Sequence, residues 1–119
     1  METGYPEAVV TLVAVVDGST SMYFSNGGGM IGAGEHAPVA EASRRWLEAG
    51  AAFLPALQPT SDEPALPGVG LTQFIAVTPS GPRVGAAPED DLGNQRHPLS
   101  PLFFAAHGVI TQIRLVQGG

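Results

Sequence analysis

Three kinds of residue are missing or scarce in this sequence, and each absence narrows the possible functions. The chain has no cysteine, which excludes disulfides, thiolate zinc sites and iron–sulfur clusters held by this chain alone. It has no lysine, which excludes the phosphate-binding loop of nucleoside triphosphatases. Charged residues make up only 13% of the chain and leave a net charge of −6, which argues against a nucleic-acid or anionic-membrane surface.

Long apolar runs are also missing. The apolar run Ala8–Val16 holds nine residues, whereas a membrane-spanning helix needs about 20. Residues 1–7 carry acidic rather than basic side chains, unlike a signal peptide. We therefore expect a cytoplasmic protein without a membrane or nucleic-acid partner. Because 44% of the 119 residues are hydrophobic, we expect residues 1–119 to form a single domain with its own core.

Hydrophobic periodicity predicts an α+β fold with the element order ββαββα. The predicted strands are Ala8–Val16, Thr20–Ser25, Leu71–Thr78 and Arg83–Ala87, and the predicted helices begin near Pro38 and Pro101. An antiparallel sheet of about four strands packed with two main helices is the simplest fold for this order. The remaining segments are predicted to be an N-terminal tail at 1–7, a proline-rich surface loop at 58–70 and a polar loop at 88–98.

Finer features of these elements can also be predicted. The first strand is apolar at every position but Thr11, which is typical of a strand covered on both faces. Glycines interrupt the second strand, and Met30 and Ile31 are expected to continue it past a bulge. Pro55 should end the first helix near Leu54. The apolar stripe of the last helix consists of Leu102, Phe103, Ala106, Val109, Ile110 and Ile113.

The segment from Asp17 to Ser21 has the pattern D-x-S-x-S, with Asp17, Ser19 and Ser21 as possible ligands. It resembles the metal-ion-dependent adhesion site of von Willebrand factor A domains, and the resemblance implies a Mg²⁺ held by a carboxylate and two hydroxyls. The competing interpretation is a hairpin turn that uses Asp, Gly and Ser for backbone reasons. We favour the turn because the predicted strand at Thr20–Ser25 follows where that family has a helix, and we expect no metal.

A glycine-rich segment follows, and Gly27, Gly29 and Gly32 formally match the dinucleotide-binding pattern G-x-G-x-x-G. In that motif, backbone amides and a helix N-terminus approach a pyrophosphate. Here no acidic residue ends the strand that follows the helix, where a ribose ligand is expected. We favour a flexible strand-to-helix connection and expect no cofactor.

Acidic and histidine side chains gather in the loop Asp90–His97 and could serve in acid–base chemistry or metal binding. The three histidines, His36, His97 and His107, are far apart in sequence, and no spacing shows that they meet. His97, which precedes a proline, is better explained as a residue that orders its own turn. We therefore expect no catalytic residue.

Adjacent aromatic residues suggest a surface for a partner. Tyr23 and Phe24 point to opposite faces of a strand, and Phe103 and Phe104 point about 100° apart on a helix. If Phe103 joins the core, Phe104 is left less covered. Tyr23, Phe24 and Phe104 are therefore candidate interaction residues on an exposed apolar patch. The alternative is that the sheet is covered on both faces.

Two hypotheses of function follow. The first is a non-catalytic protein-interaction module that forms a homodimer. The order of its elements resembles that of small roadblock- and longin-type α/β modules, which implies dimerisation through the sheet and binding to GTPase systems. The second is a small ligand- or metal-binding protein or enzyme that uses the Asp17–Ser21 turn, the Gly27–Gly34 loop or the Asp90–His97 loop. It requires at least two of these loops at the same end of the sheet.

Overall fold

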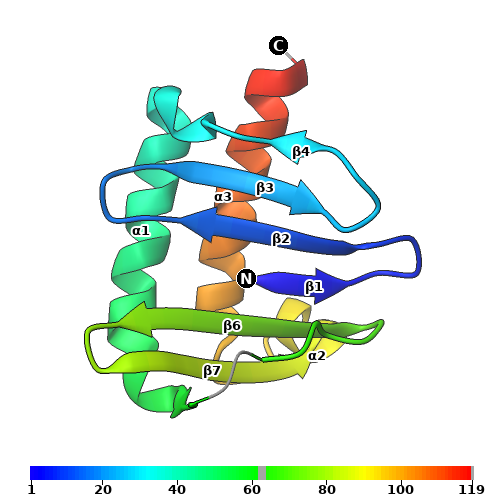
Figure 1. Ribbon diagram of the computed structural model, residues 1–119, viewed down its shortest axis with the longest axis vertical. Helices are drawn as coiled ribbons and strands as arrows, with labels where there is room; N and C mark the ends of the chain where they lie inside the picture. Colours follow the sequence, from blue (N-terminus) through cyan, green and yellow to red (C-terminus); the bar gives the residue numbers. More distant parts are fainter. Residues whose placement is uncertain (62–63, 119) are drawn as a thin grey trace.

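An antiparallel sheet forms the front of the molecule, and two long helices lie side by side behind it (Figure 1). The computed structural model describes residues 1–61 and 64–118. In that part of the chain the strands are β1 (Glu2–Gly4), β2 (Val9–Ala14), β3 (Thr20–Phe24), β4 (Gly29–Met30), β5 (Gln58–Pro59), β6 (Leu71–Thr78) and β7 (Gly81–Pro88). Their order across the sheet is β4-β3-β2-β1-β6-β7-β5.

The helical elements all follow the first four strands. They are η1 (Ala33–Glu35), α1 (Ala37–Phe53), η2 (Leu54–Ala56), α2 (Glu89–Gly93) and α3 (Ser100–Gly118), where η denotes a short 3₁₀ helix. The α+β class, the antiparallel pairing and both long helices agree with the sequence-based prediction. None of the helices in residues 1–61 and 64–118 is long and apolar enough to cross a membrane.

The core lies between the inner face of the sheet and the two long helices. The predicted apolar stripe of α3 is buried along its whole length, at Leu102, Phe103, Ala106, Val109, Ile110 and Ile113. From the sheet, Leu12, Met22 and Phe74 reach the same core. The period of the α3 pattern was therefore sufficient to identify the residues that this helix buries.

The helix α1 crosses behind the sheet from β3 to β7 (Figure 1). Near its start, the hydroxyls of Ser43 and Thr20 are hydrogen-bonded at 2.7 Å and join it to β3. Just beyond its end, the Arg83 guanidinium of β7 donates to the carbonyls of Leu54 and Leu57. As predicted, the helix ends just before Pro55. Arg83 thereby ties the segment that follows α1 to β7.

Several predictions about the sheet are wrong. It contains seven strands in the described residues rather than about four. The predicted tail at 1–7 includes β1, and Met30 belongs to a separate strand, β4, that pairs antiparallel with β3. The predicted loop at 58–70 begins with β5, and the loop at 88–98 contains α2. These elements hold two to five residues each, too few to show a period. Asp62 and Glu63 of the loop lie outside the described residues.

The prediction that the first strand is covered on both faces is also wrong. Both long helices lie on one face, and the outer face of β2 leaves Val13 39% exposed. A run of β-branched residues fits a pleated strand whether or not a second layer covers it. The run therefore predicted the strand correctly and its surroundings incorrectly.

Candidate functional site

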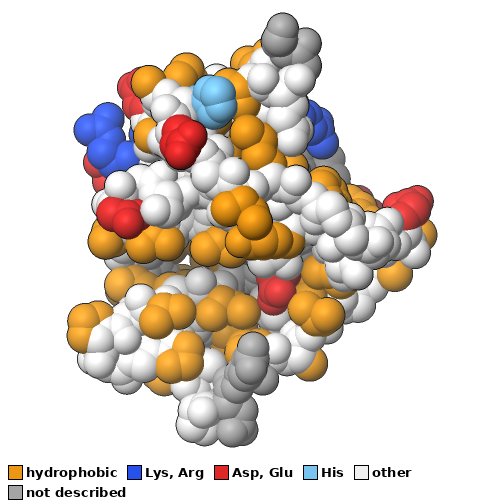
Figure 2. Space-filling model, turned by 45° about the horizontal axis from the view of Figure 1, so that its top comes forward, with side chains coloured by type: hydrophobic (Ala, Val, Ile, Leu, Met, Phe, Trp, Pro, Cys, Tyr) orange, Lys and Arg blue, Asp and Glu red, His pale blue; other side chains and the backbone are white. Residues whose placement is uncertain are grey.

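The outer face of the sheet carries apolar side chains that no helix in the described part of the chain covers. We call Val13, Val15, Tyr23, Ile75 and Val77 the open face. Val13, Val15 and Tyr23 are 39%, 45% and 42% exposed, and Val77 is 86% exposed. Figure 2 shows hydrophobic side chains in two bands across this side, with a furrow between them and most charged groups towards the margins.

Beside β1, polar groups on the outer face of the sheet are hydrogen-bonded within the chain. There the Gln73 side-chain amide donates to Glu2 at 2.8 Å and to the carbonyl of Ala65 at 3.0 Å. Among the described strands, Glu2 is the one charged side chain at an outward position, and it also accepts from Thr11. The open face therefore has no free charge in the described strands.

A slot one strand wide separates β2 from β6 over part of their length. The strand β1 lies between them and pairs with β2 through Glu2, Thr3 and Gly4 and with β6 through Glu2 and Thr3. Both neighbours run on past Met1, and no described strand occupies the space between them (Figure 1). We define the slot by its walls, which are Val13–Val15 on one side and Ile75–Thr78 on the other.

The register shows which backbone groups face the slot. Leu12 and Met1 exchange two backbone hydrogen bonds, of 2.8 and 2.9 Å, so the N–H and C=O of Leu12 point towards β1. Because these directions alternate along an antiparallel strand, Ala14 points its N–H and C=O the same way, into the slot. Glu2 faces Gln73 in the β1–β6 pairing, and the same alternation directs the N–H and C=O of Ile75 and Val77 into the slot.

Burial changes abruptly where the slot begins. Beside β1, the β6 residues Thr72, Gln73 and Phe74 are buried, with 0%, 7% and 3% of their surface exposed. Beside the slot, no residue from Ile75 to Thr78 is buried. On α1, the apolar residues Trp46, Ala49 and Phe53 are also only partly buried.

Of the candidate metal ligands, Asp17 and Ser19 lie in the turn between β2 and β3. The Asp17 carboxylate accepts the backbone N–H of Ser19 at 2.9 Å, and hydrogen bonds from Ser19 lower the pKa of Asp17. Ser21 lies on β3, opposite Val13. In the part of the chain that the structure describes, no three His, Asp or Glu side chains are placed to hold a metal ion. The turn geometry accounts for Asp17 without a metal.

The three glycines of the dinucleotide-like pattern do not form one loop. Gly27 and Gly29 lie where β3 turns into β4, whereas Gly32 precedes η1, and all three have positive φ angles. The end of this segment does meet the Asp17 turn, because a side chain at Gly34 would collide with the backbone of Gly18. Two of the three candidate loops therefore share one end of the sheet, since β4 brings the chain back along β3.

The histidines occupy separate elements. His36 precedes α1, and His97 uses its Nδ1 to accept the N–H of Leu99 at 3.0 Å, which orders the turn before α3 as expected. His107 lies on α3 with its ring 4.3 Å from that of Phe103, and burial lowers its pKa. These positions do not place the three imidazoles together.

A second group of titratable side chains lies at the end of β1. The Tyr5 hydroxyl donates to the Glu89 carboxylate at 2.9 Å, and burial together with this bond raises the pKa of Tyr5 to about 12. Glu89 and Arg114 also act on His107, with opposite effects on the pKa of that imidazole. The hydrogen bond from Tyr5 engages Glu89 within this group and ties the end of β1 to α2.

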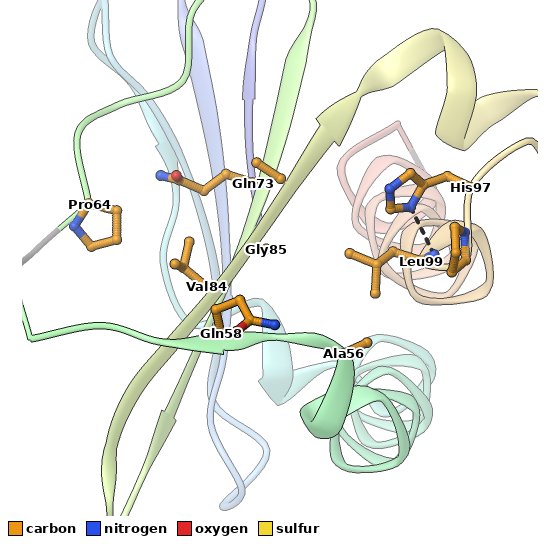
Figure 3. Close-up of a pocket in the computed structure, with 10 residues that line it drawn as sticks. Ala56, Gln58, Pro64, Gln73, Val84, Gly85, His97 and Leu99 are labelled. Atoms are coloured by element: carbon orange, nitrogen blue, oxygen red, sulfur yellow. Dashed lines mark hydrogen bonds between the residues drawn. The ribbon is translucent and has the colours of Figure 1, made fainter.

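An open hollow of about 630 Å³ borders the other edge of the sheet. In Figure 3, β7 passes between the His97–Leu99 segment on one side and Pro64 and Gln73 on the other. The walls of the hollow are mostly apolar. The Nδ1 of His97 already accepts the backbone N–H of Leu99. The hollow could therefore offer a ligand few polar groups for hydrogen bonding.

The candidate interaction residues lie on three different surfaces. Tyr23 belongs to the open face. Phe24 points towards the helix side at the end of β3 and is 36% exposed. On α3, Phe103 is buried and Phe104 is 42% exposed, as their spacing predicted. The slot was missed by sequence reasoning, because its signal is the short strand β1 within a segment that was interpreted as a tail.

Comparisons of the chain with protein-family models, with curated proteins and with solved structures find no match. Function is therefore inferred from the chain's own surfaces.

Proposed function

We propose that the protein is a non-catalytic interaction module that associates with a second copy of itself through the open face. The observation that supports this proposal is the exposure of Val13, Val15, Tyr23 and Val77 on one side of one sheet. Exposed apolar side chains that share a face are typical of interaction sites.

Charge favours this face for contact between two copies. Each copy carries a net charge of −6, so two copies repel each other over most of their surfaces. At an outward strand position the described residues hold one carboxylate, Glu2, and it already accepts hydrogen bonds from Gln73 and Thr11. Contact through the open face therefore brings few like charges together.

Sedimentation equilibrium over a range of protein concentrations tests self-association. We expect a dimer that dissociates on dilution, and we expect Val13→Glu combined with Tyr23→Glu to weaken dimerisation at least tenfold, about 1.4 kcal/mol. Leu115→Glu is the matched control, because Leu115 is 61% exposed on α3, away from the open face. A monomer at every concentration, or equal weakening by the control, would contradict this mode of association.

The meeting of the Asp17 turn with Gly34 favours a second candidate function, a small ligand- or metal-binding protein. A thermal-shift screen with divalent cations and nucleotides tests it. A reproducible stabilisation that Asp17→Asn abolishes would support this candidate, and a flat response would rule it out for these ligands.

A further inference from the structure

The hollow beside β7 lies at an edge of the sheet where one residue presents unpaired backbone groups. We propose that this hollow binds a short, extended and uncharged peptide segment of a partner protein. The backbone of the segment pairs with Ala86, and an aliphatic side chain of the segment fills the hollow. The site uses none of the residues of the open face, so the inference goes beyond self-association through that face.

The outer edge of β7 is only partly covered. The strand β5 pairs with Arg83 and Val84, whereas β7 continues to Pro88. In the described part of the chain, no strand pairs with the outer side of β7 beyond Val84. The residues just before β5 form the short helix η2, so the chain leaves the sheet at this point.

The register shows which residue presents its backbone at this edge. The carbonyl of Pro82 accepts the N–H of Thr60 at 3.0 Å, so it points away from β6. Backbone directions alternate along an antiparallel strand, so Val84 and Ala86 point their N–H and C=O groups the same way. Val84 pairs with β5, but none of the turn, loop and side-chain hydrogen bonds among the described residues uses the backbone of Ala86. Ala86 therefore offers one donor and one acceptor to a neighbouring strand.

The hollow begins at the same residues. Val84, Gly85 and Ala86 line it, with the His97–Leu99 segment on one side of the strand and Pro64 on the other (Figure 3). Its volume of about 630 Å³ lies within the range of roughly 300–1,000 Å³ that is typical of ligand sites. A hollow that reaches both sides of an edge strand suits an extended chain, whose successive side chains point to opposite sides.

The base of the hollow is already formed by packed side chains. A Cβ at Gly85 would lie 2.6 Å from the side chain of Leu57 and 3.2 Å from that of Leu99, so both leucines pack directly against the β7 backbone. Leu57 and Leu99 are 2% and 3% exposed. The side chain of Ala86 is small and exposed, so a second backbone can approach this residue without displacing a large side chain.

The walls define the chemistry of the segment. None of the described residues that line the hollow is Lys, Arg, Asp or Glu. A charged side chain of the partner would therefore lose water without gaining an opposite charge, whereas an aliphatic one gains apolar contacts. The segment thus has an aliphatic side chain beside the residue that pairs with Ala86.

Two prolines set the length of the segment. Pro82 and Pro88 lie at the same outward positions of β7 as Ala86, and neither has a backbone N–H to donate. Proline at the edge of a sheet discourages the pairing of a long strand. The segment that this edge accepts is therefore about three residues long, with its central residue opposite Ala86.

Hydrogen exchange measured by NMR provides a residue-level test. The probe is the peptide Val-Thr-Val, acetylated and amidated at its ends, and we expect a dissociation constant of about 1 mM. At about 9 mM peptide, only a tenth of the sites are free, so exchange of the Ala86 amide should slow about tenfold. The amide of Val16, which is 91% exposed, should not change. No slowing at Ala86 would overturn the proposal.

Two control peptides separate backbone pairing from simple filling of the hollow. The first carries an N-methyl group on its threonine, which removes the N–H that the Ala86 carbonyl would accept. The second is Asp-Thr-Asp, which brings charge to uncharged walls. We expect neither peptide to slow exchange at Ala86. Equal slowing by the N-methyl peptide would overturn the pairing, and equal slowing by Asp-Thr-Asp would overturn the assignment of an uncharged segment.

A matched pair of variants tests the same pairing from the protein side. Ala86→Pro removes the outward N–H and should keep the β6–β7 ladder, because Pro82 and Pro88 already occupy equivalent positions. Ala86→Val keeps the N–H. We expect Ala86→Pro to weaken peptide binding at least tenfold and Ala86→Val to change it by less than about twofold. Equal binding by both variants would overturn the proposal, and the N-methyl peptide decides if Ala86→Pro does not fold.

The variant Val13→Glu with Tyr23→Glu distinguishes this site from the open face. We expect it to bind Val-Thr-Val as the native chain does, with the same slowing at Ala86. Loss of peptide binding in this variant would place the peptide on the open face and overturn the proposal. A monomeric protein whose Ala86 amide is protected by the peptide would overturn self-association alone.

Discussion

The two halves of β6 belong to one strand yet have different surroundings. From Thr72 to Phe74 the strand has β1 on one side and β7 on the other, and all three residues are buried. From Ile75 to Thr78 it has β7 alone, and Val77 is 86% exposed. The difference in burial coincides with the presence of β1 beside one half and its absence beside the other. Burial at a strand position thus depends on the neighbouring strand as well as on the residue.

The largest difference should appear when each half is mutated separately. Phe74→Ala removes a side chain that is 3% exposed and should cost about 3–5 kcal/mol of unfolding free energy. Val77→Thr keeps a β-branched side chain at an exposed position and should change it by less than about 0.5 kcal/mol. Urea denaturation of both variants measures the contrast. Similar losses would show that the slot is closed in solution.

The bond between β1 and the buried half of β6 can be tested next. The hydroxyls of Thr3 and Thr72 are hydrogen-bonded at 2.9 Å and are 2% and 0% exposed as residues. Thr3→Val leaves the Thr72 hydroxyl buried without this partner and should cost about 1–3 kcal/mol. The double variant Thr3→Val with Thr72→Val should recover part of this loss, because neither hydroxyl then remains. A double-mutant cycle by thermal denaturation measures the coupling, and additive losses would contradict it.

The smallest expected effect is on the pH dependence of stability, through His107 behind the sheet. Burial lowers the pKa of His107 from its ordinary value of 6.5, so the unfolded chain binds this proton more readily than the folded chain. The contribution of the neutral imidazole is therefore complete above about pH 6.5 and is lost as pH falls towards the lowered pKa. His107→Gln should flatten the stability profile below about pH 6.5 relative to the native chain. An unchanged slope in urea denaturation would contradict this assignment.

The elements with a long periodic pattern could be predicted, and those defined by pairing could not. The six apolar positions of α3 identified that helix and its buried side chains, and the pattern of residues 71–78 identified β6 as a strand. In contrast, Glu2–Gly4 has no apolar pattern, and its place between β2 and β6 follows from residues about 70 positions away in sequence. Tyr23 was identified as an interaction candidate from its aromatic neighbour. Ala14 and Ala76 were not, because an open slot leaves no mark in the residues that line it.

The short β1 also has a consequence for the folding of the chain. Within the sheet, the strands from β1 to β4 pair with neighbours close in sequence, as do β6 and β7. The two groups join where Glu2 pairs with Gln73 and Thr3 with Thr72, next to a bridge between Gly4 and Val69. Contacts between distant residues are slow to form because a long loop must close first. Each group of strands can therefore form early, and the rate of folding should depend on when the pairing between β1 and β6 forms. Additional pairing between β1 and β6 should therefore make the two groups of strands associate faster and separate more slowly.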